Sequence, residues 1–284
     1  MTRVPRVRGL IGHTGYVGTT LRGQTEFDAG FRSSTIGEIK GRHFDLLVCA
    51  GAPAAKWRAN TDPAGDAASV DALIAHLDTV TANDFVLIST VDVFGDPYGV
   101  DESTKVDTAG LHPYGANRRR LEQFCADKFI NALVVRLPGL VGPGLRKNVI
   151  HDLRHGNALE AVDSRGVFQF YPMVNLWTDV ATAIGANLSL VHLTAQPLQV
   201  AEVAAEGFGR EFGNELDGPV ARYDFRTTYA GLFGGVGAYQ YSRRESMLAI
   251  RAYAQSEPTT VSLSSVEASG TARSARTAPS SPAR

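Results

Sequence analysis

The sequence predicts the α/β fold class: a doubly wound parallel sheet with a smaller lobe toward the C-terminus. Two observations lead to this prediction. Strand-like apolar runs alternate with segments of helical spacing through the first half of the chain, and the first apolar run ends in a glycine-rich stretch, residues 11–18 (IGHTGYVG). An alternation of strand, helix and strand implies crossover connections, which make the strands of one sheet parallel.

The glycine-rich stretch stands where a first strand, beginning at Val7, would turn into a first helix. Glycines let the backbone approach a pyrophosphate closely, and the free amides of a helix N-terminus supply donors. The spacing is Gly-x-x-Gly-x-x-Gly rather than Gly-x-Gly-x-x-Gly, and by itself such a turn also fits an ordinary loop. The residues that we expect at a dinucleotide phosphate are Gly12, Thr14, Gly15, Tyr16, Val17 and Gly18.

Residues 27–31 are predicted as the second strand, with Arg32 and Ser33 at its carboxyl end. In such folds this position touches the adenosine ribose, where an acidic residue favours NAD. A guanidinium and a hydroxyl could instead hold a 2′-phosphate, so the sequence favours NADP. A solvated arginine in a polar loop is the alternative interpretation.

The next elements follow at regular intervals. Residues 45–50 (DLLVCA) and 85–88 are apolar runs typical of strands buried on both faces, and a segment of helical spacing, 70–80, separates them. A helix over 115–129 and a strand over 132–137 are predicted next.

Polar side chains are predicted at the carboxyl edge of this sheet, where ligands of open α/β sheets bind. Thr90 and Asp92 follow the strand that ends at Ile88. Tyr114 and Arg118 lie four residues apart at the start of the next helix, so they share one helical face. A phenol and a cation are therefore expected as neighbours.

The ordered motifs GHTGYVG, CAGAP, STVDVFG, PYGANR and RLPGLVGPG, within about residues 7–200, resemble the extended short-chain dehydrogenase/reductases. That family acts mostly on nucleotide sugars, as epimerases, dehydratases and 4-keto reductases. The resemblance implies a Rossmann NAD(P)-binding core over 1–140, joined by about 176–200, and a substrate lobe over 141–175 and 200–254. It also implies cofactor contacts from Ala50, Gly51 and Ala52, and it leaves open a homodimer formed through the tyrosine-bearing helix and the helix before it.

The resemblance assigns roles at the predicted edge. Thr90 matches the family's serine or threonine, Tyr114 its catalytic tyrosine, and Arg118 the place of its lysine. A phenol has a pKa of about 10, and a nearby cation favours the phenolate, so the pair could exchange a proton with a sugar oxygen while hydride passes to or from nicotinamide. Thr90 would hydrogen-bond the same oxygen, and Arg118 would hold the nicotinamide ribose.

Two departures from the family pattern narrow the chemistry. A guanidinium is never a proton carrier, so relay through the lysine's ammonium has no counterpart at Arg118. Either Arg118 still tunes Tyr114, or the site binds cofactor without turnover. Val91 replaces the first acid of the dehydratases, which argues against 4,6-dehydration and leaves reduction or epimerisation. Asp92 is then either an acid or base, or a carboxylate satisfied by backbone amides in a turn.

The second half of the chain is predicted to contain three helices and one strand. The helices are expected over 145–153, 200–212 and 244–253, and the strand within 168–172. Lys147 and Asn148, with Arg146, could meet a nucleotide-sugar diphosphate, and Arg226 or Tyr223 could close over a substrate. The alternative for Arg146, Lys147 and Asn148 is a solvated basic helix start. The alternative for Tyr223 and Arg226 is packing and pairing at the lobe surface.

Composition excludes several classes. The formal net charge of −1 gives no reason to expect nucleic acid or an anionic membrane as partner. Cys49 and Cys125 are too few for a disulfide framework and lack metal-ligand spacing, and His151 and His192 have no partners at ligand spacing. We expect a cytoplasmic protein, with a disordered tail over 255–284.

The resulting hypothesis is an NAD(P)-dependent keto-sugar reductase or epimerase acting on a nucleotide sugar. Two alternatives stay open: a catalytically silent or regulatory NAD(P)-binding protein, and a ketone reductase of secondary metabolism.

Overall fold

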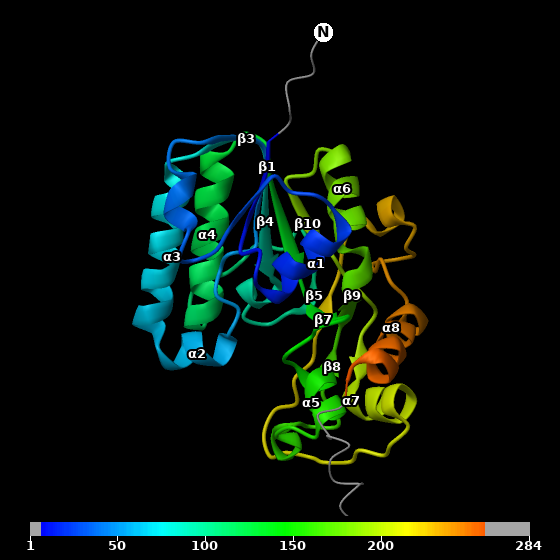
Figure 1. Ribbon diagram of the computed structural model, residues 1–284. Helices are drawn as coiled ribbons and strands as arrows, with labels where there is room; N and C mark the ends of the chain where they lie inside the picture. The colour runs from blue at the N-terminus through cyan, green and yellow to red at the C-terminus, as the bar shows by residue number, and fades with distance from the viewer. Residues whose placement is uncertain (1–6, 259–284) are drawn as a thin grey trace, which may run out of the picture.

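The computed structural model describes residues 7–258, and its central feature is a six-stranded parallel sheet (Figure 1). The α/β prediction is confirmed. The strand order is β2-β1-β3-β4-β6-β10, so the chain reverses its direction of progress between β1 and β3, which makes the switch point where such sheets bind ligands. The strands are β1 (Arg8–Ile11), β2 (Ala29–Phe31), β3 (His43–Cys49), β4 (Thr81–Thr90), β6 (Ala132–Leu137) and β10 (Leu190–His192).

Helices cover both faces of the sheet. One face carries α3 (Pro63–Asp78) and α4 (Pro113–Lys128), with the short α2 (Lys56–Thr61) at their end; the other carries α1 (Tyr16–Gln24) and α6 (Leu176–Gly185) (Figure 1). In β4, Phe85 and Leu87 pack into the core under α3 and α4, whereas Val86 packs into the core under α6. This double burial explains why the strand sequences are continuous apolar runs rather than alternating ones.

The smaller lobe is built from short pieces around its own apolar cluster, which includes Leu153, Phe170 and Ile250. Three two-stranded pairs contribute: β7 with β9 and β5 with β12 in parallel, and β8 with β11 antiparallel. The elements of this region are β5 (Tyr98–Val100), β7 (Gly139–Val141), α5 (Val149–His155), β8 (Val167–Phe168), β9 (Phe170–Pro172), β11 (Leu198–Gln199), α7 (Val200–Glu202), the π-helix Val203–Gly207, β12 (Asp224–Phe225) and α8 (Arg243–Ser256).

Element boundaries were predicted better in the core than in this lobe. The helix expected over 145–153 begins only at Val149, because Asn148 has a φ of 111° and caps the helix instead of joining it. The strand expected within 168–172 is interrupted at Gln169, whose buried amide nitrogen donates to the carbonyls of Ala195 and Phe225. The helix expected over 200–212 ends as a π-helical turn at Gly207.

The predicted tail over 255–284 lies outside the described residues from 259 onward, and its first two residues still belong to α8. None of the described helices is both long enough and apolar enough to cross a membrane. Over residues 7–258, no group of three or more His, Cys, Asp or Glu side chains is arranged to hold a metal ion.

Candidate active site

The glycine turn after β1 is fixed by contacts within the chain. Gly12 has a φ of +82° and donates its amide to the Phe31 carbonyl at 2.8 Å. A Cβ on Gly12 would overlap the carbonyl of Ala50, and one on Gly18 would overlap the carbonyl of Gly12. These two glycines are therefore required so that the turn can lie against the end of β3 and against α1.

Gly15 has a different environment. A Cβ there would lie 3.5 Å from the Gly12 carbonyl oxygen, which is an ordinary contact, so the fold itself does not demand glycine. Gly15 is the N-cap of α1, where no side chain caps the helix and no acidic residue occupies the first turn. The first amides of a helix have no partner within it and attract anions. These amides could hold an anionic group such as a phosphate, with Thr14 exposed and Tyr16 and Val17 half-buried beside them.

The end of β2 presents a cationic surface. Arg32 and Ser33 are exposed, and the Arg32 amide donates to Thr35 Oγ1 at 3.1 Å. The pKa of His13 in the glycine turn is lowered, first by burial and then by the positive charges of Arg22 and Arg32. The positive charges of Arg22 in α1 and Arg32 after β2 thus both act on the glycine turn at His13.

Tyr114 lies in the first turn of α4, where local capping sets its position. His112 is the N-cap and its Nδ1 accepts from the Gly115 amide at 3.0 Å, while Asn60 Oδ1 accepts from the Tyr114 amide at 3.2 Å. A Cβ on Gly115 would overlap the Asp92 carbonyl oxygen, so only glycine lets α4 begin this close to the turn after β4. The Tyr114 side chain has Thr90 as a hydrogen-bond partner and is 8% exposed.

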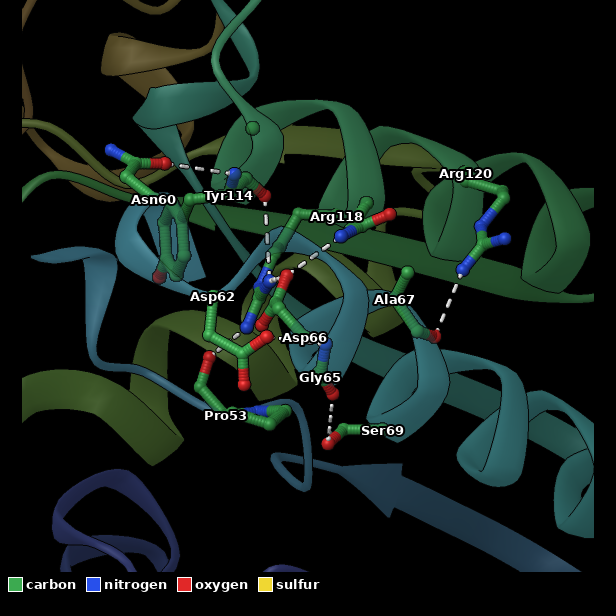
Figure 2. A network of polar contacts seen from close by, with 12 residues as sticks. Pro53, Asn60, Asp62, Gly65, Asp66, Ala67, Ser69, Tyr114, Arg118 and Arg120 are labelled. Atoms are coloured by element: carbon green, nitrogen blue, oxygen red, sulfur yellow. Dashed lines mark hydrogen bonds and ion pairs between the residues drawn. The ribbon is translucent and has the colours of Figure 1, made fainter. Parts of the chain in front are cut away.

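Arg118 contacts Tyr114 through the ring face, with its Cζ 4.1 Å from the ring centroid. Its Nη1 donates to Asp66 Oδ2 at 2.5 Å, and its Nη2 donates to the carbonyl of Pro53 (Figure 2). Only Nε lacks a partner among the described residues, and the side chain is 3% exposed. The guanidinium is therefore held by α3 and by the loop after β3.

The pKa of Tyr114 is raised. Burial is the largest cause, and the charge of Asp92 also raises the pKa. Three effects lower it: the charge of Arg118, a hydrogen bond from Thr90 and the charge of Lys56. Arg118 favours the phenolate, as expected, but burial outweighs this effect, so the pKa of Tyr114 lies above that of a free phenol. At neutral pH Tyr114 is a protonated phenol, which can donate a proton.

Asp92 interacts mainly with side chains. Its Oδ1 accepts from Lys56 Nζ at 2.7 Å and from the Tyr223 hydroxyl at 3.4 Å, and its Oδ2 accepts from Thr90 Oγ1 at 3.3 Å. Thr90 Oγ1 in turn accepts from the Asp92 amide at 3.1 Å. The alternative of a carboxylate satisfied by backbone amides is thus wrong. Lys56 was not predicted, because a lone lysine after a strand carries no pattern.

The predicted substrate residues are placed differently from one another. Lys147 Nζ donates to the Ala54 carbonyl, and burial lowers its pKa, with a smaller contribution from Arg118. Asn148 caps α5, with Oδ1 accepting from the Ile150 amide at 2.9 Å and Nδ2 donating to the Leu140 carbonyl at 2.8 Å. Arg226 pairs with Asp224 at 2.5 Å. Lys147 alone of the three reaches the loop after β3.

That loop joins the two halves of the site. A Cβ on Gly51 would lie 2.7 Å from Ile11 Cγ2, and Ala52 packs against the core under α3. Ala50, Gly51 and Ala52 thus connect the glycine turn to the Pro53 and Ala54 carbonyls, which hold Arg118 and Lys147. A parallel sheet with a glycine turn at its switch point and a threonine and tyrosine at its carboxyl edge is the arrangement implied by the resemblance to the extended short-chain dehydrogenase/reductases.

Comparison with solved structures supports this class at the level of fold. No family model and no curated protein sequence matches the chain. The structure is similar to dTDP-4-dehydrorhamnose reductase from Bacillus anthracis in complex with NADP, with a TM-score of 0.67, 16% identity, and coverage of 89% of this chain and 100% of that one. It is also similar to a double mutant of a dTDP-glucose 4,6-dehydratase from Streptomyces venezuelae with NAD bound (TM-score 0.64, 14% identity, 88% and 97% coverage).

A third similar structure is UDP-glucose 4-epimerase from Thermotoga maritima with UDP-glucose, with a TM-score of 0.63, 14% identity, and coverage of 87% of this chain and 98% of that one. The chain therefore has the fold of the extended short-chain dehydrogenase/reductases over nearly its whole described length. These solved enzymes include a reductase, a dehydratase and an epimerase, so the fold does not select the reaction.

Proposed function

We propose that this protein is an NAD(P)-dependent oxidoreductase that reduces the keto group of a nucleotide sugar, with Tyr114 as the proton donor. One observation carries the proposal: contacts run without interruption from the glycine turn to a protonated phenol. Gly12 lies against Ala50, the carbonyl of Pro53 holds Arg118, and Arg118 stacks on Tyr114. The phosphate cradle and the proton donor therefore belong to one site.

The chemistry follows from the protonation state. A bound nicotinamide would supply hydride to the carbonyl carbon, and Tyr114 would give its proton to the carbonyl oxygen while Thr90 hydrogen-bonds that oxygen. A phenol whose pKa is raised by burial is suited to donating at neutral pH, whereas oxidation, the first half of an epimerisation, needs the phenolate. Reduction is therefore the reaction that the site favours over epimerisation.

The neighbouring residues support the choice of substrate and cofactor. Val91 is buried at 3% exposure and has no acid–base group, which argues against 4,6-dehydration. Lys147 could place a charge near a sugar diphosphate, and the surface of His13, Arg22, Arg32 and Ser33 favours the 2′-phosphate of NADP over NAD.

The test is stopped-flow absorbance of NADPH with a panel of dTDP- and UDP-linked 4-keto sugars and a simple ketone that carries no nucleotide. We expect oxidation of NADPH with a nucleotide-linked ketone. Tyr114→Phe should abolish turnover, with NADPH affinity nearly unchanged, and Tyr98→Phe, at an exposed tyrosine, is the matched control. Full activity of Tyr114→Phe would refute the proton-donor role, and turnover of the simple ketone alone would support a ketone reductase instead.

One observation favours a second candidate, a dinucleotide-binding protein without turnover. Both terminal nitrogens of Arg118 donate within the protein, to Asp66 and to the Pro53 carbonyl, and the side chain is only 3% exposed. A cofactor ribose would have to compete with these partners. NADPH binding without oxidation on any ketone of the panel would support this candidate, and a gain of turnover in Arg118→Lys would show that the guanidinium is what silences the site.

A further inference from the structure

Tyr114 needs a source of protons, and its neighbour Arg118 is not one. If Tyr114 donates a proton in each turnover, as the proposed function holds, its phenolate has to be reprotonated before the next. Tyr114 is 8% exposed, which restricts direct access from water. A guanidinium remains charged at any pH that the protein survives, so it holds its protons.

A set of exchangeable groups leads from solvent toward the phenol by another route. Lys56 Nζ lies 2.7 Å from Asp92 Oδ1, and Asp92 Oδ2 lies 3.3 Å from Thr90 Oγ1. The packing of Gly115 on the Asp92 carbonyl brings Tyr114 against this turn, and Thr90 is a hydrogen-bond partner of the Tyr114 hydroxyl. The side chains are 40% exposed at Lys56 and 19% exposed at Asp92, so exposure decreases along the route.

We propose that Lys56, Asp92 and Thr90 form a proton relay that reprotonates Tyr114 after each reduction. In the reduction the Tyr114 O–H bond breaks and the O–H bond of the product alcohol forms. The Thr90 hydroxyl then gives its proton to the phenolate and takes one from Asp92, which has taken it from the Lys56 ammonium. The Lys56 amine takes a proton from solvent. Each turnover thus consumes one solvent proton and one hydride from the dinucleotide.

Other charged and titratable groups also face the pair. The Tyr223 hydroxyl donates to Asp92 at 3.4 Å, and the charges of Lys147 and Asp92 affect one another. The pKa of His112 is lowered, first by burial and then by Lys56, so His112 is neutral near pH 7 and lacks a proton to give. Lys56 is therefore the partly exposed ammonium in direct contact with Asp92. Lys56 and Asp92 affect the reaction through Thr90 and Tyr114.

The decisive variant is Lys56→Met, studied with NADPH and the 4-keto nucleotide sugar that the wild type turns over best. The first turnover uses the proton already on Tyr114, so its rate should stay within twofold of wild type. Steady-state kcat should fall by about 100-fold, the scale of one general acid–base contribution. A burst of one NADPH per site followed by slow turnover is the expected trace, and D₂O should slow the second phase more than the first.

Three further variants make the result unambiguous. Asp92→Asn should give the same burst, and Lys56→Arg, which keeps the charge, should remain slow because it exchanges no proton. Lys40→Met, at an exposed lysine far from these contacts, is the control that should match wild type. Recovery of kcat in Lys56→Arg, an equally slow first turnover in Lys56→Met, or full activity of Lys56→Met would each overturn the relay. If the wild type is active and Tyr114→Phe is inactive, the proposed function stands even when the relay is overturned. If the wild type shows no turnover, both the proposed function and the relay are refuted.

Discussion

The ion pair between Asp66 and Arg118 provides the strongest test of how the site is held together. Both side chains are almost completely buried, at 4% and 3% exposure, and Asp66 Oδ2 also accepts from Asn117 Nδ2 at 2.8 Å. Asp66→Ala would leave a buried guanidinium without its counter-ion. Removing one partner of a buried pair typically costs about 3–5 kcal/mol, because the remaining charge is uncompensated. We expect Asp66→Ala to lower the free energy of unfolding by that amount.

Urea unfolding with linear extrapolation measures this loss, and unchanged m values would show that the transition stays comparable. The matched control is Asp71→Ala on the same helix, because Asp71 pairs with Arg120 on α4 at 2.9 Å while both side chains are largely exposed. That pair should contribute less than about 1 kcal/mol. The double variant Asp66→Leu with Arg118→Met should recover at least half of the loss. An Asp66→Ala cost no larger than that of Asp71→Ala would refute the reasoning.

Three further predictions concern the glycine turn, a buried histidine and a helix cap. Gly12→Ala should lower the free energy of unfolding in urea by more than about 2 kcal/mol, because it combines a positive φ with a backbone overlap. Gly15→Ala should lower it by less than about 1 kcal/mol and mainly weaken NADPH binding, measured by a fluorescence titration. Equal losses of stability in the two variants would contradict this. Burial lowers the pKa of His192 from 6.5 to about 4, so between these pH values His192 is protonated in the unfolded chain but not in the folded protein. The free energy of unfolding should therefore fall as pH falls from about 6.5 to about 4, by at most about 1.4 kcal/mol per pH unit. His192→Gln should show a shallower dependence on pH in urea unfolding at several pH values, and an unaltered slope would argue against this. Ser242→Ala should lose about 1 kcal/mol in the same assay, since Ser242 and Glu245 form a reciprocal capping box at α8; an unaltered unfolding midpoint would show that the cap contributes nothing.

The sequence was most informative where local pattern and burial agree. The strand over 132–137 was predicted with the boundaries that the structure has, and the glycine spacing located the turn between β1 and α1. Both faces of the sheet are covered, so its strands are marked by uninterrupted apolar runs, and its crossovers by helical periodicity. The small lobe was predicted less well, because its two- and three-residue strands are too short to establish a period.

At the candidate site, the sequence by itself determined which chemical groups stand at the carboxyl edge of the sheet, because Thr90 and Asp92 come at the end of a recognisable strand and Tyr114 begins a recognisable helix. Only the tertiary structure decided how these groups are paired. Asp66 and Arg118 are 52 residues apart, and Lys56 and Asp92 are 36 apart. Burial then set the protonation state of Tyr114 against the pull of its neighbouring cations. Desolvation and long-range ion pairs depend on which surfaces the fold brings together, and no local pattern of residues records that.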